Sequence, residues 1–234
     1  MADRARRWPV AKEGLPFCAA GAAGWAGAAA LGWTGLGAVL AATTVFTAWF
    51  FRNPARTVPQ APNLVVSPGD GRVLAVIEED EPRFLKDRAI RVSIFLSPLN
   101  VHINRTPCEG TVTSVAHYPG KFLVASRPGA TLENEQTAVL IETAKGQRVL
   151  CVQVAGYVAR RIVTWLKQGE RVARGERYGL IRFGSRMDVY LPVSTEVKVA
   201  AGARVHGGES VIGILSGTGD HGKSGRPSGK EPAP

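Results

Sequence analysis

The sequence predicts a mainly β domain preceded by a helical anchor near the N-terminus. One observation is that no charged side chain occurs from Gly14 to Phe51, a stretch longer than the roughly 20 residues that a membrane-spanning helix needs. A second is that short apolar runs alternate with turn residues from Thr57 to about Ser216, as in all-β domains. A third is a glycine-rich turn motif that occurs twice near the C-terminus.

The uncharged stretch, residues 14–51, is too long for one straight membrane helix and divides most simply into two short ones. Glycines around Gly35 offer a turn near its centre. Basic side chains precede the stretch, in residues 1–13, and follow it at Arg52 and Arg56. Positive charge on both sides favours two cytoplasmic ends, which predicts a transmembrane helical hairpin. A single tilted span and a cleaved signal peptide are the alternatives.

Residues 52–216 carry the pattern of a β-rich domain with one or two short helices. A helix is expected over Ala159–Lys167, where Ile162, Trp165 and Leu166 would share one face. Residues 217–234 are rich in Gly, Ser, Lys and Pro and are predicted to be a disordered tail. The expected strands are Leu64–Val66, Gly71–Ile77, Ile90–Leu96, Gly110–His117, Ala138–Thr143, Arg148–Val154, Arg177–Phe183, Asp188–Leu191, Glu196–Val199 and Ser210–Leu215.

The repeated motif is Gly-x-Arg-Val-x-x-Gly-Glu, at Gly169–Glu176 and again at Gly202–Glu209, and an apolar strand follows each copy. Its glycines are expected to supply positive φ at tight turns, while its valines fill the core. Such turns resemble the hairpins of barrel-sandwich-hybrid folds, for example lipoyl-carrier domains. A carrier would present a lysine at a hairpin tip, and no equivalent lysine occurs here, which disfavours a carrier function.

The net charge is +10 and the sequence pI is about 10.0. Because 45% of the residues are hydrophobic, the chain is not a disordered polyelectrolyte. Many basic proteins bind nucleic acid, but this sequence has no recognition motif for it, and we expect no nucleic-acid partner. Together with the apolar anchor, the charge favours a membrane surface with anionic lipid.

The chain has three cysteines, Cys18, Cys108 and Cys151. Their odd number and wide spacing argue against a disulfide framework and against a cysteine-only zinc site. We therefore expect free thiols in a reducing compartment and no metal site.

Gly184 and Ser185 lie between two β-like runs, and alone this pair would be an ordinary turn. Two further segments, Ser67–Val73 and Phe95–Pro107, change that interpretation. Together the three resemble the phosphatidylserine decarboxylase family in its short, membrane-anchored bacterial form. The resemblance extends from Phe50 to about Leu215, and it includes the segments Phe50–Arg56, His117–Phe122, Glu133–Glu135 and Gly156–Arg161.

The resemblance implies a self-cleaving proenzyme that is cut between Gly184 and Ser185. The products would be a β chain, residues 1–184, and an α chain that begins with a pyruvoyl group made from Ser185. This cofactor would accept electrons while phosphatidylserine loses CO₂ and becomes phosphatidylethanolamine. The resemblance also implies that the protein is located at the cell (inner) membrane, with its catalytic domain facing the cytoplasm. From there the domain would reach its phospholipid substrate in the membrane.

The residue types suit that chemistry. The Ser185 hydroxyl would attack the carbonyl of Gly184, which has no Cβ to obstruct it. A serine hydroxyl is a weak nucleophile and needs a base, for which His102 is the best candidate near pH 7. Asp70 lies between two glycines and would orient the His102 imidazole, as in other Ser-His-Asp sites.

One departure from the family concerns Arg105, which stands where longer members have a second histidine. His102 therefore serves both cleavage and decarboxylation, or His117 supplies one of the two roles. Arg160 and Arg161 would bind the substrate phosphate or form a solvated face, and His117 and Arg105 are the other candidates for substrate binding.

Two other functions stay open. In one, the chain is a non-catalytic, membrane-anchored scaffold in which Gly184-Ser185 is only a turn. In the other, it decarboxylates a different serine-bearing lipid. The α and β chains would remain partners of each other, and a homo-oligomer is also left open.

Overall fold

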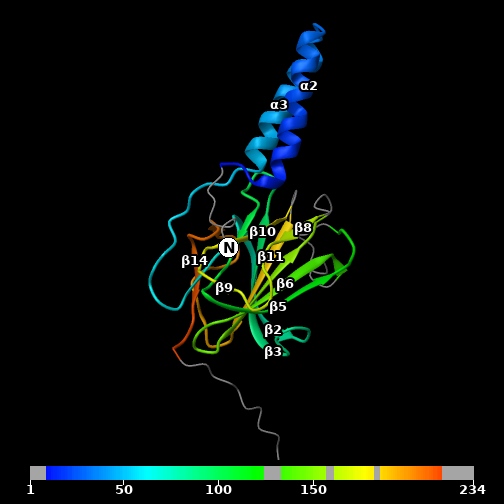
Figure 1. Cartoon of the computed structure of the whole chain (residues 1–234). Helices are drawn as coiled ribbons and strands as arrows, with labels where there is room; N and C mark the ends of the chain where they lie inside the picture. Colours follow the sequence, from blue (N-terminus) through cyan, green and yellow to red (C-terminus); the bar gives the residue numbers. More distant parts are fainter. Residues whose placement is uncertain (1–8, 124–132, 157–160, 182–184, 218–234) are drawn as a thin grey trace, which may run out of the picture.

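A helical hairpin projects from one end of a β domain in the computed structural model (Figure 1). The structure describes residues 9–123, 133–156, 161–181 and 185–217. A short 3₁₀ helix, η1 (Lys12–Gly14), leads into α2 (Leu15–Ala30), and α3 (Thr34–Phe50) returns to the domain. The chain reverses at Gly32, whose φ of 69° is a left-handed conformation that glycine adopts without steric cost. The predicted helical hairpin and its glycine turn are therefore confirmed.

The membrane-crossing part of that prediction is wrong, because no helix in the described part of the chain is long and apolar enough to span a membrane. The helices have 16 and 17 residues. At 1.5 Å per residue such helices are about 25 Å long, short of the roughly 30 Å hydrocarbon core of a bilayer. The uncharged stretch as a whole is long enough to cross a membrane. Once the residues of the turn and of the helix ends are left out, each helix is too short.

The strands form one large antiparallel sheet and two small ones within the described residues. The large sheet has the order β13-β2-β3-β11-β7-β6-β5-β9, and the small sheets are β1-β14-β12 and β4-β10-β8. The strands are β1 (Leu64–Val66), β2 (Gly71–Glu81), β3 (Asp87–Leu96), β4 (Ile103–Arg105), β5 (Gly110–Tyr118), β6 (Gln136–Glu142), β7 (Arg148–Val154), β8 (Ile162–Thr164), β9 (Arg171–Val172), β10 (Arg177–Ile181), β11 (Ser185–Pro192), β12 (Glu196–Val197), β13 (Arg204–Val205) and β14 (Val211–Ile214).

Strand β11 lies in the middle of the large sheet, between β3 and β7, and is buried over nearly its whole length. Alternate side chains of a strand point to opposite faces of the sheet. Met187, Val189 and Leu191 accordingly enter the largest hydrophobic cluster, whereas Tyr190 packs into a second cluster. Ser185, two residues before Met187, begins this strand on the side of the main core.

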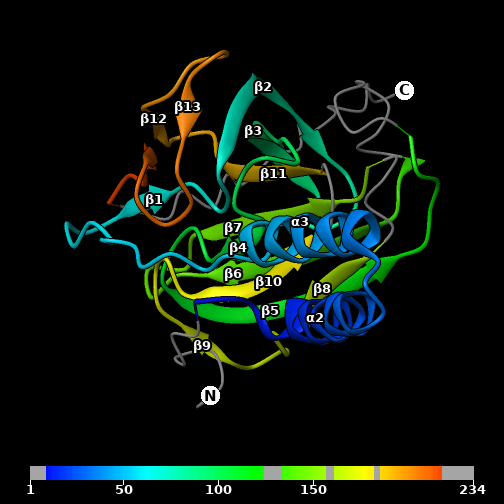
Figure 2. The ribbon, with the colours of Figure 1, turned by 90° about the horizontal axis from the view of Figure 1, so that it is seen from above.

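The foot of the hairpin packs on the small sheet β4-β10-β8. Seen along the hairpin, these strands lie beneath the two helices (Figure 2). Phe50 and Phe51 share a hydrophobic cluster with Ile103 of β4 and Leu180 of β10. This cluster fixes the hairpin against one end of the domain.

The predicted β pattern is confirmed, but the helix expected over Ala159–Lys167 is wrong in its described part. Ile162–Thr164 form β8, which pairs with β10. Two of its residues are β-branched and apolar, and pairing with a buried strand prevails over a periodicity that fits either structure. Residues 157–160 lie outside the described part of the chain.

Corresponding glycines in the two copies of the repeated motif have similar positive φ angles. Gly169 and Gly202 have φ of 86° and 89°, and Gly175 and Gly208 have φ of 73° and 80°. The valines of both copies, Val172 and Val205, are buried. The predicted turns are therefore confirmed.

Candidate active site at the foot of the hairpin

His102 lies directly under the hairpin, in the segment that connects β3 to β4. The Ile181 N–H donates to the His102 carbonyl at 3.4 Å, so the pairing of β10 with β4 extends to His102. The side chain is buried, with 3% of the residue exposed. The Phe50 ring, at the end of α3, lies 4.2 Å from the imidazole between ring centroids. His102 is therefore enclosed between the domain and the hairpin.

Ser185 is the first residue of β11 and pairs with Leu96, the last residue of β3. It is fully buried, and its Oγ has no hydrogen-bond partner among the described residues. The strand that leads to Ser185, β10, ends at Ile181, which is bonded to His102. Ser185 and His102 thus lie at the same end of the domain. Gly184, the other residue of the predicted cleavage site, lies outside the described residues.

The surroundings of His102 keep its imidazole neutral near pH 7. Burial lowers the pKa of His102 to about 4, and it outweighs the opposing effect of the Asn100 backbone. The charge of Arg52 also lowers this pKa, whereas the charge of Asp70 raises it. Neither ring nitrogen has a hydrogen-bond partner within the described part of the chain. A neutral imidazole with free nitrogens is the form that accepts a proton.

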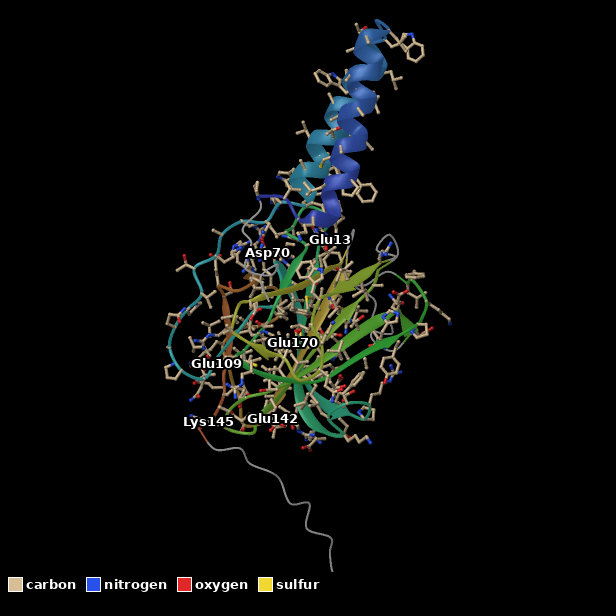
Figure 3. The ribbon with its side chains drawn as sticks, viewed as in Figure 1. Glu13, Asp70, Glu109, Glu142, Lys145 and Glu170 are labelled. Carbon is tan, nitrogen blue, oxygen red and sulfur yellow. The ribbon has the colours of Figure 1, made fainter. Side chains whose placement is uncertain are left out.

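Asp70 lies at the same end of the domain (Figure 3), but it does not hydrogen-bond to the His102 ring. Its Oδ1 and Oδ2 accept from Nη2 of Arg56 at 3.0 and 2.8 Å. Its Oδ1 also accepts from the Gly207 N–H at 2.8 Å. Nδ1 of His206 lies 3.8 Å from Oδ2 of Asp70. In this structure Asp70 acts on His102 only through its charge, and the expected orienting contact is absent.

Arg105 ties two loops to the strand that follows His102. Its Nη1 donates to the Gly175 carbonyl at 2.9 Å, and its Nη2 donates to the Pro54 carbonyl at 3.2 Å. Burial, followed by the charges of Arg56 and Arg177, lowers the pKa of Arg105 to about 10. The geometry gives Arg105 a structural task next to the site.

The other predicted substrate-binding residues are not brought to Ser185. His117 on β5 is half-exposed, and its Nδ1 lies 3.1 Å from Oγ1 of Thr137. It is in register with Met187, but three strands away along the sheet, which is about 14 Å. Arg161 is exposed just before β8, and Arg160 lies outside the described residues.

A buried amide network that sequence reasoning missed lies beside Ser185. Gln153 of β7 donates its Nε2 to Oδ1 of Asn104 at 2.7 Å, and its Oε1 accepts from Oγ1 of Thr164 at 2.5 Å. Gln153 pairs with Met187 and is therefore a diagonal neighbour of Ser185 on the same face. Asn104 is fully buried, and its Nδ2 has no partner among the described residues. The polar residues in otherwise apolar strands were the available signal.

A second feature that the sequence did not reveal is an ion pair directly after Ser185. Nε and Nη2 of Arg186 lie 2.7 and 2.8 Å from the two oxygens of Asp188. Both residues are almost completely buried. Two residues apart on one strand, they share the face opposite to Ser185. The Arg186 charge is thus satisfied on the far side of the sheet.

A pocket elsewhere in the domain contains none of these residues. Its lining includes Asn63, Cys108, Glu109 and Lys145. Glu109 and Lys145 lie at the end of the domain remote from Asp70 and the hairpin (Figure 3). Across the ranges that the structure describes, no group of three or more His, Cys, Asp or Glu side chains is arranged to hold a metal ion.

The sequence of this chain is similar to those of several known proteins. A family model described as phosphatidylserine decarboxylase matches residues 43–213. The phosphatidylserine decarboxylase proenzyme of Symbiobacterium thermophilum is 51% identical over 90% of this chain and 97% of the relative. Those of Geotalea uraniireducens and Geobacter sulfurreducens are 46% and 49% identical, over 91% and 88% of this chain and 99% and 97% of the relatives. Among solved structures, glucose permease IIA from Mycoplasma capricolum aligns at 17% identity with a TM-score of 0.39, over 65% of this chain and 95% of that chain.

Proposed function

The chain belongs to the phosphatidylserine decarboxylase family, and on that premise we propose that it converts phosphatidylserine to phosphatidylethanolamine and CO₂. One observation carries the proposal beyond the family. Ser185 is fully buried with an unpartnered hydroxyl, at the same end of the domain as an unpartnered, neutral imidazole. Unpaired buried polar groups are costly for a fold, and they cluster where chemistry is done.

The chain first cleaves itself. Ser185 Oγ attacks the carbonyl carbon of residue 184 while His102 takes the hydroxyl proton. The carbon–nitrogen bond then breaks, and the imidazolium returns the proton to the Ser185 nitrogen, which converts the amide to an ester. Loss of the Ser185 Hα as a proton then drives β-elimination, which releases residues 1–184 as a carboxylate and leaves dehydroalanine at position 185. Water hydrolyses this dehydroalanine to a pyruvoyl group and ammonia.

The residues around Ser185 fit a pyruvoyl group formed from it. The position is dry, and backbone pairing with β3 on one side and β7 on the other holds β11 in place after the cut. When formed, this group supplies a conjugated carbonyl that accepts electrons as CO₂ leaves. His102, which is neutral beforehand, would deliver to the product carbon a proton that it first accepts from the substrate ammonium group, and the buried walls exclude water.

Asp70 contributes through its charge, which favours the protonated imidazole while His102 carries the proton. We do not assign a role in proton transfer to His117, because its strand, β5, is three strands away from β11, the strand of Ser185. Arg161 remains a candidate for the substrate phosphate, since it is exposed at the edge of the small sheet. Arg105 is not proposed for that role, because its terminal nitrogens contact backbone carbonyls.

The protein is also proposed to work at the inner membrane with the domain on the cytoplasmic side. A phospholipid substrate requires access to a lipid surface. The hairpin offers exposed apolar side chains for entry from one face of the bilayer, including Phe17, Trp25, Leu31 and Trp33. Vesicle flotation tests this: Leu31→Glu together with Trp33→Glu should reduce binding to anionic vesicles.

Denaturing electrophoresis and a lipid assay test the enzymatic proposal together. The wild-type protein should run as two fragments, the smaller without a free amino terminus, and should produce phosphatidylethanolamine from phosphatidylserine vesicles. Ser185→Ala should stay as one band and be inactive. A folded wild type that remains uncut would support the scaffold alternative. Cleavage without turnover of phosphatidylserine, but with turnover of another serine-bearing lipid, would change the substrate assignment.

A further inference from the structure

We propose that Phe50, the last residue of the hairpin, is a positioning residue that holds the His102 imidazole for proton transfer at Ser185. The inference rests on the proposed self-cleavage at Ser185. It gives the hairpin a part in the reaction besides contact with lipid.

The contact between the two rings is direct. Phe50 is 1% exposed, and its ring centroid lies 4.2 Å from that of His102 with an interplanar angle of 33°. Phe51 packs edge-on against the same Phe50 ring at 5.1 Å, and Phe46 lies 6.4 Å from it. Contacts with Phe46 and Phe51 therefore hold the Phe50 ring in place against the imidazole.

The imidazole depends on this packing because the Asn100 backbone, which acts on its protonation, makes no well-formed hydrogen bond to either ring nitrogen. Both ring nitrogens are without a partner in the described residues, and Asp70 is held by Arg56. A histidine side chain in this situation is oriented by the shape of its cavity. The ring of Phe50 is one wall of that cavity, and it also excludes water from the imidazole.

Arg52, which follows the hairpin, reinforces this arrangement. Arg52 Nη2 donates to the carbonyl of Leu99, in the loop that carries His102, at 2.9 Å. Its guanidinium carbon lies 4.0 Å from the centroid of the Trp49 ring, which ties the loop to α3. The charges that act on His102 are those of Arg52, which opposes protonation, and Asp70, which favours it, while the Asn100 backbone also favours the protonated form.

The matched pair of variants is Phe50→Leu and Phe51→Leu. Both remove one aromatic ring at adjacent buried positions; the Phe50 ring packs on His102, whereas the Phe51 ring packs on Phe17 and Phe50. Self-cleavage is followed by electrophoresis from pH 3.5 to 8. Without the Phe50 ring, water reaches the imidazole and its pKa rises toward the ordinary value of about 6.5.

Phe50→Leu should slow self-cleavage at least tenfold at pH 7 and move the acid limb of the rate profile upward by one pH unit or more. Phe51→Leu should keep the wild-type acid limb and cleave within about threefold of the wild-type rate. Equal slowing of both variants with an unchanged acid limb would mean that Phe50 only stabilises the fold, and would overturn the proposal.

A measurement that needs no change at Phe50 covers the case in which that variant does not fold. In uncut Ser185→Ala protein, the His102 ring protons should show an upfield ring-current shift, and they should titrate near pH 4 by NMR. Unshifted protons that titrate near pH 6.5 would overturn the inference, whether or not the wild type cleaves itself. A wild type that does not cleave would instead contradict the proposed function.

Discussion

Arg56 contacts both carboxylate oxygens of Asp70, with its Nη2 at 3.0 and 2.8 Å from them. Each side chain is only 10% exposed. The same guanidinium donates its Nη1 to Oε2 of Glu209 at 2.9 Å, so one arginine after the hairpin binds two acidic residues from opposite ends of the domain sequence. Asp70 is therefore committed to Arg56 in the uncut chain.

Arg56→Leu should lower the free energy of unfolding by about 3 kcal/mol, because it leaves a buried carboxylate without its cation. Urea denaturation of the uncut Ser185→Ala protein measures this. Adding Asp70→Asn to Arg56→Leu should recover part of the loss, since the amide removes the charge and still accepts from the Gly207 N–H. A double variant as unstable as the sum of its single changes would contradict the interpretation.

Self-cleavage should persist in weak acid, because the pKa of His102 is lowered to about 4 by burial. A base must be deprotonated to act, so the rate should be nearly constant from pH 7 to 5 and fall only as the pH drops through 4. Electrophoresis of samples stopped at successive times gives this profile. A fall in rate centred near pH 6.5 would show an exposed imidazole instead.

The same shift makes the stability of the fold depend on pH. Between pH 6.5 and 4 the unfolded chain binds a proton at His102 that the folded chain does not, so stability is lost as the pH falls through this window. The full effect is about 3 kcal/mol. Denaturation of Ser185→Ala protein at pH 7 and 4 should show it, and His102→Leu in that background should lack this part of the pH dependence.

Gln153→Leu should destabilise the domain by about 2 to 3 kcal/mol, because the carbonyl of Asn104 and the hydroxyl of Thr164 both lose their buried partner. Gln147→Leu is the control, since Gln147 bonds to a backbone carbonyl near the end of the described chain, that of Ser216. Thermal melts compare the two. Similar losses in both variants would mean that the network adds nothing beyond a single hydrogen bond.

Two glycines of the repeated turn separate backbone strain from steric clash. Gly202 and Gly208 both have positive φ, 89° and 80°. A Cβ at Gly202 would meet nothing within 4 Å, whereas one at Gly208 would lie 2.8 Å from Cδ of Arg105. Gly202→Ala should cost about 1 kcal/mol from the backbone alone, and Gly208→Ala clearly more. Equal melting temperatures would show that Arg105 moves aside freely.

Features that depend on neighbours along the chain could be predicted from the sequence. The uncharged stretch and its glycines specify the hairpin, and alternating apolar residues specify most strands. The repeated glycines specify the turns around Gly175 and Gly208, because positive φ is a local requirement. The segments that resemble the family pointed to Ser185 and His102, which the fold brings to the same end of the domain.

The contacts between these residues could not be predicted, because they depend on how the whole chain packs. Asp70 pairs with Arg56, His102 packs on Phe50, and His117 is separated from Ser185 by the width of three strands. Residues 162–164 form a strand because they pair with the buried strand β10. Such contacts depend on the order of strands in a sheet and on the packing of the hairpin against it. Both are set by the burial of the whole chain, which no local pattern encodes.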